Sequence, residues 1–346
     1  MGFLPKLSDS EWLFEEKKFV QGHLSHYESI FALANGYMGV RASIETNPAL
    51  ADPGFYVAGI YDQTHGHAHE IVNLPCWLGI GLNVEGFDFD IRKGKILEYY
   101  RALDLKQGML FTRIVWRDAA AHTTRLETVR LLHQQDKHAA VIMGRIVPMD
   151  YSAGITMSSS IDAWSVKYAS PSRESRFHKV AAKDMGKDGV CLSAATRQTG
   201  LEVAVTSCLE VEGAGPKSSS RNDEKVCESV PLRVEKGRAV SFCKTVSVWT
   251  SRDSENPSEK ASKDLRRIRR ISPEAFFRSH AKAWADVWEK SDIRIEGDAR
   301  AQKGIRFNIF HLASLANPGD DGVSLGAKGL HGNGYSGLVF WDTEIY

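Results

Sequence analysis

The sequence predicts a mainly β domain with the layout of an antiparallel sandwich, followed by helices. Within residues 1–255, several runs alternate apolar and polar side chains, which is the period of a half-buried strand. Residues 251–264 are polar throughout, and this break in composition is the best candidate for a domain boundary. Helix signals follow the break, beginning with a cap at Ser272. The three observations place the β part first and the helical part second.

The clearest strand is expected over residues 201–211. Its apolar side chains occupy one face, and Glu202, Thr206 and Glu210 fall on the other. Residues 155–161 and 240–248 repeat the alternation. The stretches 212–217 and 218–225 are rich in turn residues. Strands separated in this way favour an antiparallel sandwich over a parallel α/β sheet.

Two helices are expected after the boundary. Ser272 is the N-cap of the first, with Pro273 at its first position and Glu274 in its first turn. One apolar stripe along this helix is formed by Phe277, Ala281, Trp284 and Trp288. The second helix begins near Asp298 and ends at 317–319. Its expected apolar face consists of Ile305, Ile309, Leu312 and Ala316.

The 346 residues carry a net charge of +1 at pH 7. This balance gives no electrostatic reason to expect nucleic acid or an anionic membrane as a partner, and it favours a small neutral ligand or no ligand. The five cysteines are far apart and include no C-x-x-C pair, which favours buried thiols in a reducing compartment. The N-terminus lacks the apolar segment of a signal peptide, and no apolar run approaches the ~18 residues of a membrane span. We therefore expect a cytoplasmic protein.

Three polar patterns are further candidate sites. Residues 332–337 match G-x-G-x-x-G, but loop composition precedes them and no helix cap follows, so a nucleotide site is disfavoured. Residues 65–70 hold His65, His67 and His69, which could ligate a transition metal, although a solvated loop is the favoured interpretation. The arginine pairs at 266–267 and 269–270 are interpreted as a solvated or interdomain face of a linker helix.

The last eighteen residues, 329–346, carry the strongest functional signal. Four glycines free the backbone for tight turns and lead to Trp341 and Asp342, with Glu344 two residues further on. An indole face beside a carboxylate suits a sugar, because the ring stacks on the pyranose while the carboxylate accepts hydrogen bonds from its hydroxyl groups. On spacing alone, a buried tryptophan next to a helix-capping aspartate is the more common arrangement.

Residues 329–346 closely resemble the signature G-L-x-G-x-G-Y-x-G-H-x-F-W-D-T-E of glycoside hydrolase family 65, which includes maltose, trehalose and kojibiose phosphorylases. Leu338 stands where this family usually has a histidine, which bears on the polarity of the expected sugar pocket. Segments resembling other motifs of the family are residues 35–41, 56–61, 72–75 and 104–108. The resemblance thus covers nearly the whole chain.

The resemblance implies a mainly β N-terminal super-sandwich over residues 1–255, a helical linker over 256–292, and the beginning of an (α/α)6 catalytic barrel over 293–346. Twelve helices of roughly 11–12 residues, with connections of roughly 4–6, require on the order of 200 residues or more. About 55 residues follow Asp292. We therefore expect an incomplete barrel and interpret the chain as the N-terminal part of an enzyme.

The activity implied by the resemblance is inverting phosphorolysis of an α-glucosyl disaccharide to β-glucose 1-phosphate and glucose. Trp341 and Asp342 are then substrate-binding residues. Glu344 is a structural or supporting residue, and the general acid is expected downstream of Tyr346, so this chain alone should be inactive. The reaction needs no cofactor beyond inorganic phosphate as co-substrate, and the complete enzyme is expected to act on a disaccharide, commonly as a homodimer.

Two alternatives stay open at this point. The family resemblance also reaches acid trehalases, so a trehalase-like hydrolase is the alternative enzyme. A non-catalytic carbohydrate-binding module is the alternative outside the enzyme class.

Overall fold

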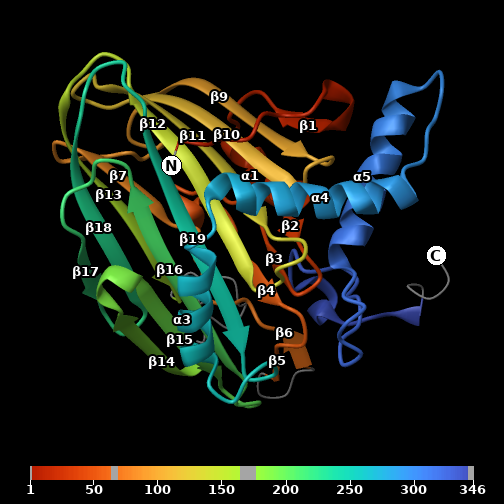
Figure 1. The fold of residues 1–346 in the computed structure, drawn as a ribbon. Helices are drawn as coiled ribbons and strands as arrows, with labels where there is room; N and C mark the ends of the chain where they lie inside the picture. Colours follow the sequence, from red (N-terminus) through yellow and green to blue (C-terminus); the bar gives the residue numbers. More distant parts are fainter. Residues whose placement is uncertain (1, 64–68, 164–176, 342–346) are drawn as a thin grey trace.

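The computed structural model describes residues 2–63, 69–163 and 177–341. The strands of the chain, which all lie before residue 251 among the described residues, form antiparallel sheets (Figure 1). The larger sheet has nine strands, in the order β1 (Leu13–Glu16), β9 (Lys95–Asp104), β10 (Met109–Arg117), β11 (Thr123–Leu132), β12 (Ala139–Pro148), β19 (Val240–Thr250), β16 (Glu202–Val211), β15 (Val190–Thr196) and β14 (Phe177–Asp184).

A second sheet of five strands completes the sandwich, in the order β17 (Ser218–Arg221), β18 (Lys225–Val234), β13 (Ala153–Asp162), β7 (Ile80–Val84) and β8 (Phe87–Asp88). Two smaller sheets consist of β2 (Leu33–Ala34), β3 (Met38–Val40) and β4 (Phe55–Val57), and of β5 (Tyr61–Gln63) and β6 (His69–Ile71). The main apolar core draws on strands of both large sheets. The predicted antiparallel β-sandwich is confirmed.

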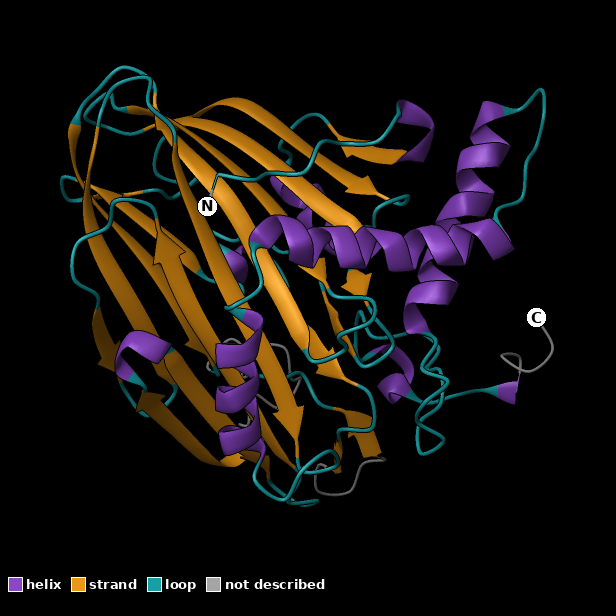
Figure 2. Ribbon diagram, viewed as in Figure 1, coloured by secondary structure: helices purple, strands orange, loops and turns teal. Residues whose placement is uncertain are grey.

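Four α-helices are described: α1 (Leu24–Ile30), α3 (Pro257–Ile268), α4 (Pro273–Ser291) and α5 (Ala299–Leu315). Figure 2 shows α3 lying along the strands and α4 beginning over them and crossing toward their edge, whereas α5 lies to one side of the sandwich. Phe276 of α4 packs against Met109 and Val129 of the large sheet. No helix among the described residues has the length and apolarity needed to cross a membrane. The domain limits expected at residues 255 and 292 fall just before α3 and just after α4, and they stay a prediction.

The predicted alternation holds where one face of a strand meets solvent. In β13, the residues Ile155, Met157, Ser159 and Ile161 are buried, and the residues that alternate with them are more exposed. In β16 the opposite, polar face is also covered at Thr206, which is fully buried. Its hydroxyl lies 3.2 Å from the Ala261 carbonyl oxygen of α3. The outer face is therefore covered by a helix, and polar residues there form hydrogen bonds to it.

The stretch 218–225 is not a turn throughout, because Ser218–Arg221 forms the edge strand β17. All four of its residues are exposed. A polar, exposed edge strand has the composition of a loop, since it need not contribute to the core. Sequence alternation therefore gave no signal for it.

The cap of α4 is confirmed: the Ser272 hydroxyl accepts a hydrogen bond from the Ala275 amide at 3.2 Å. Trp284 and Trp288 are buried as predicted, but Phe277 and Ala281 are only half-buried. Phe276 and His280 take the inner positions instead. A histidine occupies the buried face because its ring nitrogens are hydrogen-bonded there, which offsets the cost of burial.

The predicted apolar face of α5 was wrong. Asp298 caps the helix as expected, but the buried residues are Gln302, Arg306, Phe310 and Ser314, and Leu312 is 63% exposed. Arg306 pairs with Asp292 at 2.9 Å, and its guanidinium lies 3.6 Å from the centre of the Trp12 ring. Phe310 stacks on Trp284 at 4.7 Å. Because of these contacts, the face of α5 that carries Arg306 and Phe310 packs against the rest of the protein.

A buried ionic cluster joins the large sheet to residues 41–45. Arg130 of β11 donates to the Glu45 carboxylate at 2.6 Å and to the Ser43 carbonyl oxygen at 2.6 Å. Arg101 of β9 donates to the Ala42 carbonyl oxygen and lies 3.4 Å from Glu16. Both arginine side chains are fully buried. Each guanidinium therefore depends on these partners, because a buried charge without them is costly.

Replacing Arg130 by methionine should lower the free energy of unfolding by about 3–5 kcal/mol, because the Glu45 carboxylate would remain buried without its partner. The control is Arg278→Met in α4, where the ion pair to Glu274 is 74% and 57% exposed. The control should change stability by no more than about 0.5 kcal/mol. Urea unfolding measures both. Equal effects of the two substitutions would contradict the assigned role.

His280 should make stability fall as pH falls. Burial lowers the pKa of His280 to about 3, below the value of about 6.5 expected in the unfolded chain. Its Nδ1 accepts from the Gln134 amide at 3.2 Å, and its Nε2 donates to the Gln107 carbonyl at 2.9 Å. Below pH about 6.5 the unfolded state therefore binds a proton that the folded state does not bind, and the free energy of unfolding falls until the pH reaches about 3.

Between pH 7 and pH 5, protonation of His280 in the unfolded state should lower the free energy of unfolding by about 2 kcal/mol. Urea unfolding of His280→Asn should accordingly show a smaller loss over that interval than the wild type. The exposed His23 provides the control, since His23→Asn should keep the wild-type dependence. An unchanged pH dependence in His280→Asn would show that another group is responsible.

Candidate functional site

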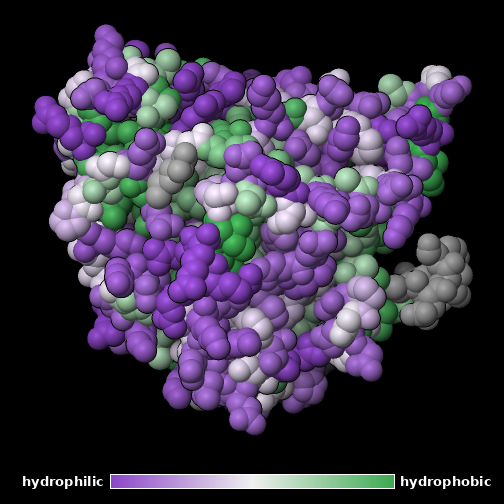
Figure 3. Space-filling view, in the orientation of Figure 1, coloured by the Kyte–Doolittle hydropathy of each residue, from purple (hydrophilic) through white to green (hydrophobic). Residues whose placement is uncertain are grey.

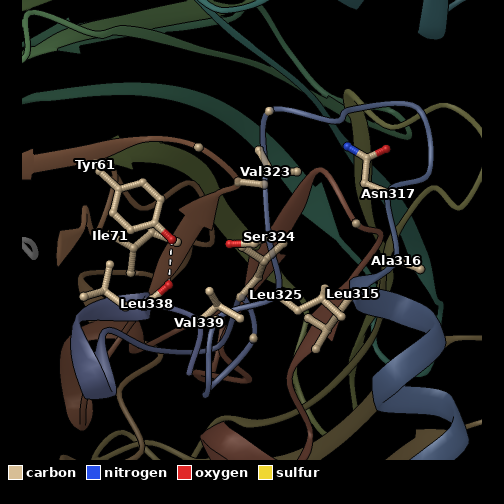
Figure 4. Close-up of a pocket in the computed structure, with 18 of the residues that line it drawn as sticks. Tyr61, Ile71, Leu315, Ala316, Asn317, Val323, Ser324, Leu325, Leu338 and Val339 are labelled. Carbon is tan, nitrogen blue, oxygen red and sulfur yellow. Dashed lines mark hydrogen bonds between the residues drawn. The ribbon is translucent and has the colours of Figure 1, made fainter. Parts of the chain in front are cut away.

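A cavity of about 750 Å³ lies between the β domain and the segment that follows α5 (Figure 4). The β domain contributes Gly36, Ala58, Gly59, Tyr61, His69 and Ile71. The other wall is formed by residues of the C-terminal segment, within 315–318, 322–326, 329–330 and 337–339. No aspartate or glutamate is among these described lining residues. The cavity therefore joins two parts of the chain that are far apart in sequence.

Glycines allow the two walls to approach each other at backbone distance. A Cβ atom at Gly36 would lie 2.2 Å from the Ala316 carbonyl oxygen, and one at Gly39 would lie 2.3 Å from the Leu330 carbonyl oxygen. Gly36 also has φ of +85°, which disfavours other residues. The segment 35–41 thus acts as a seat for the C-terminal segment.

Tyr61 holds the C-terminal segment at Gly337. Its hydroxyl donates to the Gly337 carbonyl oxygen at 2.6 Å, the dashed line of Figure 4. Gly337 has φ of +68°, and a Cβ atom there would lie 2.5 Å from Cγ2 of Ile71. Leu338 and Val339 follow directly and line the cavity. The wall at the position of the family histidine is therefore apolar here.

An ion pair joins the β domain to the C-terminal segment beside the cavity. Arg252, just after β19, makes two parallel hydrogen bonds to Asp320, at 2.9 and 3.0 Å. The same guanidinium donates to the Ala58 carbonyl oxygen at 3.1 Å. The Arg252 hydrogen bond lowers the pKa of the Asp320 carboxyl group. Such a bidentate pair fixes orientation as well as distance.

Arg41 connects the site to the buried ionic cluster. Its guanidinium donates to the His331 carbonyl oxygen at 3.1 Å and to the Ser25 and Asp52 carbonyl oxygens at 3.0 and 2.7 Å. Its own carbonyl oxygen accepts from Arg130 at 3.1 Å. The C-terminal segment is thus held by the same residues that fix the β domain beneath it.

Two histidines behind this wall are neutral at pH 7. Burial lowers the pKa of His331 to about 3 and that of His311 to about 4. Their rings lie 5.2 Å apart, and Nε2 of His311 is 3.3 Å from the Ile30 carbonyl oxygen. Neither imidazole carries a proton that it could give to a substrate at neutral pH.

The two predicted sugar-binding residues are only partly described. Trp341 is 70% exposed and is not among the residues that line the cavity, although Val339, two residues earlier, is. Asp342 and Glu344 lie outside the described residues. The assignment of Trp341 and Asp342 to a sugar site therefore stays a prediction.

The alternative sites of the sequence analysis gain no support. Residues 332–337 lie in a loop and a 3-10 helix (Gly334–Gly337), with Tyr335 and Ser336 at positive φ, and no strand or α-helix flanks them among the described residues 316–341. His65 and His67 lie outside the described residues, and His69 lines the cavity. No group of metal-binding side chains is found in the part of the chain that the structure describes.

Sequence reasoning matched residues 35–41 and 56–61 to family motifs but gave them no place in the site. The structure shows that these motifs form the seat of the C-terminal segment. The glycines at 36 and 39 were the available signal, since a conformation or contact that excludes Cβ often underlies them. Their spacing did not reveal which segment they would contact.

Comparison with known proteins agrees with this arrangement. The family model "Glycosyl hydrolase family 65, N-terminal domain" matches residues 14–287, and "Glycosyl hydrolase family 65 central catalytic domain" matches residues 306–346. The kojibiose phosphorylase of Thermoanaerobacter brockii is 34% identical over 98% of this chain, and the maltose phosphorylase of Bacillus subtilis is 30% identical over 97%. The chain spans 46% of the length of each of these two relatives.

The alpha,alpha-trehalose phosphorylase of T. brockii is 28% identical over 97% of this chain. Among solved structures, a protein from the human microbiome assigned as a kojibiose phosphorylase superposes with a TM-score of 0.89. It shares 23% identity, and the match covers 98% of this chain and 46% of that one. The structural likeness supports the fold, and the family models identify the lineage: this chain belongs to glycoside hydrolase family 65.

Proposed function

We propose that this chain supplies the β domain and the first part of the catalytic domain of an inverting α-glucosyl disaccharide phosphorylase. The match to the catalytic-domain model over residues 306–346, at the C-terminal wall of the cavity, carries the proposal. The relatives named above are phosphorylases of kojibiose, maltose and trehalose. The reaction is cleavage of such a disaccharide by inorganic phosphate to β-glucose 1-phosphate and glucose.

The proposed division of labour follows from the residues that line the cavity. Inversion by phosphate needs one protein carboxylic acid over the glycosidic oxygen, while phosphate attacks the opposite face of the sugar. None of the described lining residues is a carboxylic acid. We therefore assign protonation to the region of the relatives beyond the 46% that this chain spans, and we assign positioning of the non-reducing glucose to this chain.

Trp341 and Asp342 are the residues proposed to hold that glucose. The Trp341 ring is exposed, so a sugar face can stack on it without displacing a protein contact. An aspartate beside it can accept hydrogen bonds from two sugar hydroxyl groups. Tyr61, Arg252 and Arg41 support these residues by fixing the backbone that leads to them.

Removal of the aspartate charge should weaken sugar binding. Asp342→Asn should raise the glucose dissociation constant at least about tenfold, since a hydrogen bond to a charged group contributes about 1.5–3 kcal/mol. Trp341→Ala should weaken binding by a similar factor through loss of the stacking face. Isothermal titration calorimetry on the 346-residue chain measures both. Phe87→Ala, an exposed aromatic of β8, is the control and should have no effect.

The phosphorylase assignment is tested with a chimera in which the remainder of the T. brockii kojibiose phosphorylase follows Tyr346. Chain and chimera are incubated with kojibiose, maltose or trehalose, with and without phosphate. The 346-residue chain should release no glucose 1-phosphate, because its described cavity offers no acid. The chimera should release it only with phosphate, and Asp342→Asn should lower its kcat/KM at least about tenfold. Release of glucose without phosphate would identify a hydrolase instead.

A further inference from the structure

A second hollow lies on the outer surface of the sandwich, between α3 and the loop that connects β11 to β12. It has a volume of about 600 Å³ and shares no lining residue with the cavity described above. We call it the α3 groove and define it by its lining residues, which are Asp136, His138, Trp249, Lys260, Lys263, Asp264, Arg266, Arg267 and Arg270. Figure 3 shows hydrophilic side chains gathered over α3 on this face.

The floor of the α3 groove is rigid and aromatic. The His138 imidazole stacks on the Trp249 indole with a centroid distance of 3.6 Å and an angle of 5° between the rings. Nδ1 of His138 is 2.8 Å from the Val248 carbonyl oxygen, and Nε1 of Trp249 donates to Asp264 at 3.3 Å. These contacts hold both rings in place, so the groove has a fixed shape.

Both carboxylates of the groove are already engaged. Asp264 accepts from Arg267 at 2.7 Å and from the Ser247 hydroxyl at 2.9 Å. Asp136 pairs with the same Arg267 from the opposite wall. Arg267 therefore joins the two walls and is neutralised by them. Its charge is not available to a ligand.

Three cations remain without a carboxylate partner. Arg266 pairs with Asp188 at 3.3 Å, outside the groove. Lys260, Lys263 and Arg270 make no ion pair with any described residue, and all three are exposed. Lys260 lies over the Trp249 ring at 4.8 Å from its centre. The groove thus gathers positive charge although the whole chain has a net charge of only +1.

The number of these cations indicates the charge of the ligand. Lys260 and Lys263 are one helical turn apart on α3, and Arg270 lies two residues beyond the last residue of that helix, Ile268, so that all three line the groove. Two linked phosphate groups carry enough negative charge to pair with three cations, whereas a single phosphate carries at most about two charges. A hollow of this volume suits a small molecule.

We infer that the α3 groove binds a small ligand that carries two linked phosphate groups, separately from the sugar site. Lys263 and Arg270 are the main contacts of the ligand, and Lys260 is a further contact beside the Trp249 ring. The His138–Trp249 pair forms the floor of the groove. Charge-assisted hydrogen bonds to phosphate oxygens hold the ligand. The inference concerns no residue of the proposed reaction and does not depend on it.

Inorganic pyrophosphate is the probe, titrated into the 346-residue chain by calorimetry at low ionic strength. One equivalent should bind, at least about tenfold more tightly than inorganic phosphate. The double variant Lys263→Gln/Arg270→Gln should weaken pyrophosphate binding at least about tenfold. These side chains are exposed, so the variant should unfold at the wild-type urea concentration.

The matched control is Lys282→Gln/Lys290→Gln in α4, which removes the same two charges from exposed positions outside the groove. Its pyrophosphate affinity should stay within about twofold of the wild type. Equal weakening in the two double variants would mean that only overall charge matters, and it would overturn the inference. Pyrophosphate binding no tighter than that of phosphate would overturn it as well.

Discussion

The buried arginines of the β domain are the constraint on which the rest of the structure depends. Arg101 and Arg130 rise from adjacent regions of the large sheet and donate to the backbone of residues 41–45. Burial raises the pKa of Glu16 and of Glu28 even though each lies near an arginine, which indicates how dry this region is. In such surroundings a register error would leave charges unpaired at a cost of several kcal/mol. The backbone at 41–45 therefore has one permitted position.

That position determines where the C-terminal segment can lie. The Arg41 carbonyl oxygen accepts a hydrogen bond from Arg130 of the cluster, and the Arg41 guanidinium donates to the His331 carbonyl oxygen. Gly36 and Gly39, just before Arg41, have no side chain, so the backbone of Ala316 and Leu330 can pack directly against them. The contacts at this junction are mostly hydrogen bonds and close backbone packing, which impose direction as well as proximity. The β domain thus contributes geometry to the site, and its described lining residues contribute no acid or base of their own.

The sequence predicted the strands and helices better than it predicted which of their faces are buried, because burial depends on distant parts of the chain. Alternation identified β13 and β16, because side chains alternate between the two faces of any strand. It gave no sign that Thr206 is buried, since its hydrogen-bond partner lies in α3, more than fifty residues away. The face of α5 was misassigned because Arg306 is buried by an ion pair and by the Trp12 ring, neither of which leaves a local trace. The C-terminal signature was recognisable from its residues alone, whereas its seat became evident only in three dimensions.

Charge shows the same limit in a different form. A net charge of +1 argued against anionic partners, and that argument holds for the long-range field of the whole chain. It does not hold within about 10 Å, where screening leaves local groups in control. The fold pairs Arg267 with carboxylates from two walls and leaves Lys260, Lys263 and Arg270 without a carboxylate among the described residues, so a nearly neutral protein presents a cationic groove. Local charge therefore depends on which carboxylates the fold brings close to each cation, and the net charge of the sequence does not contain that information.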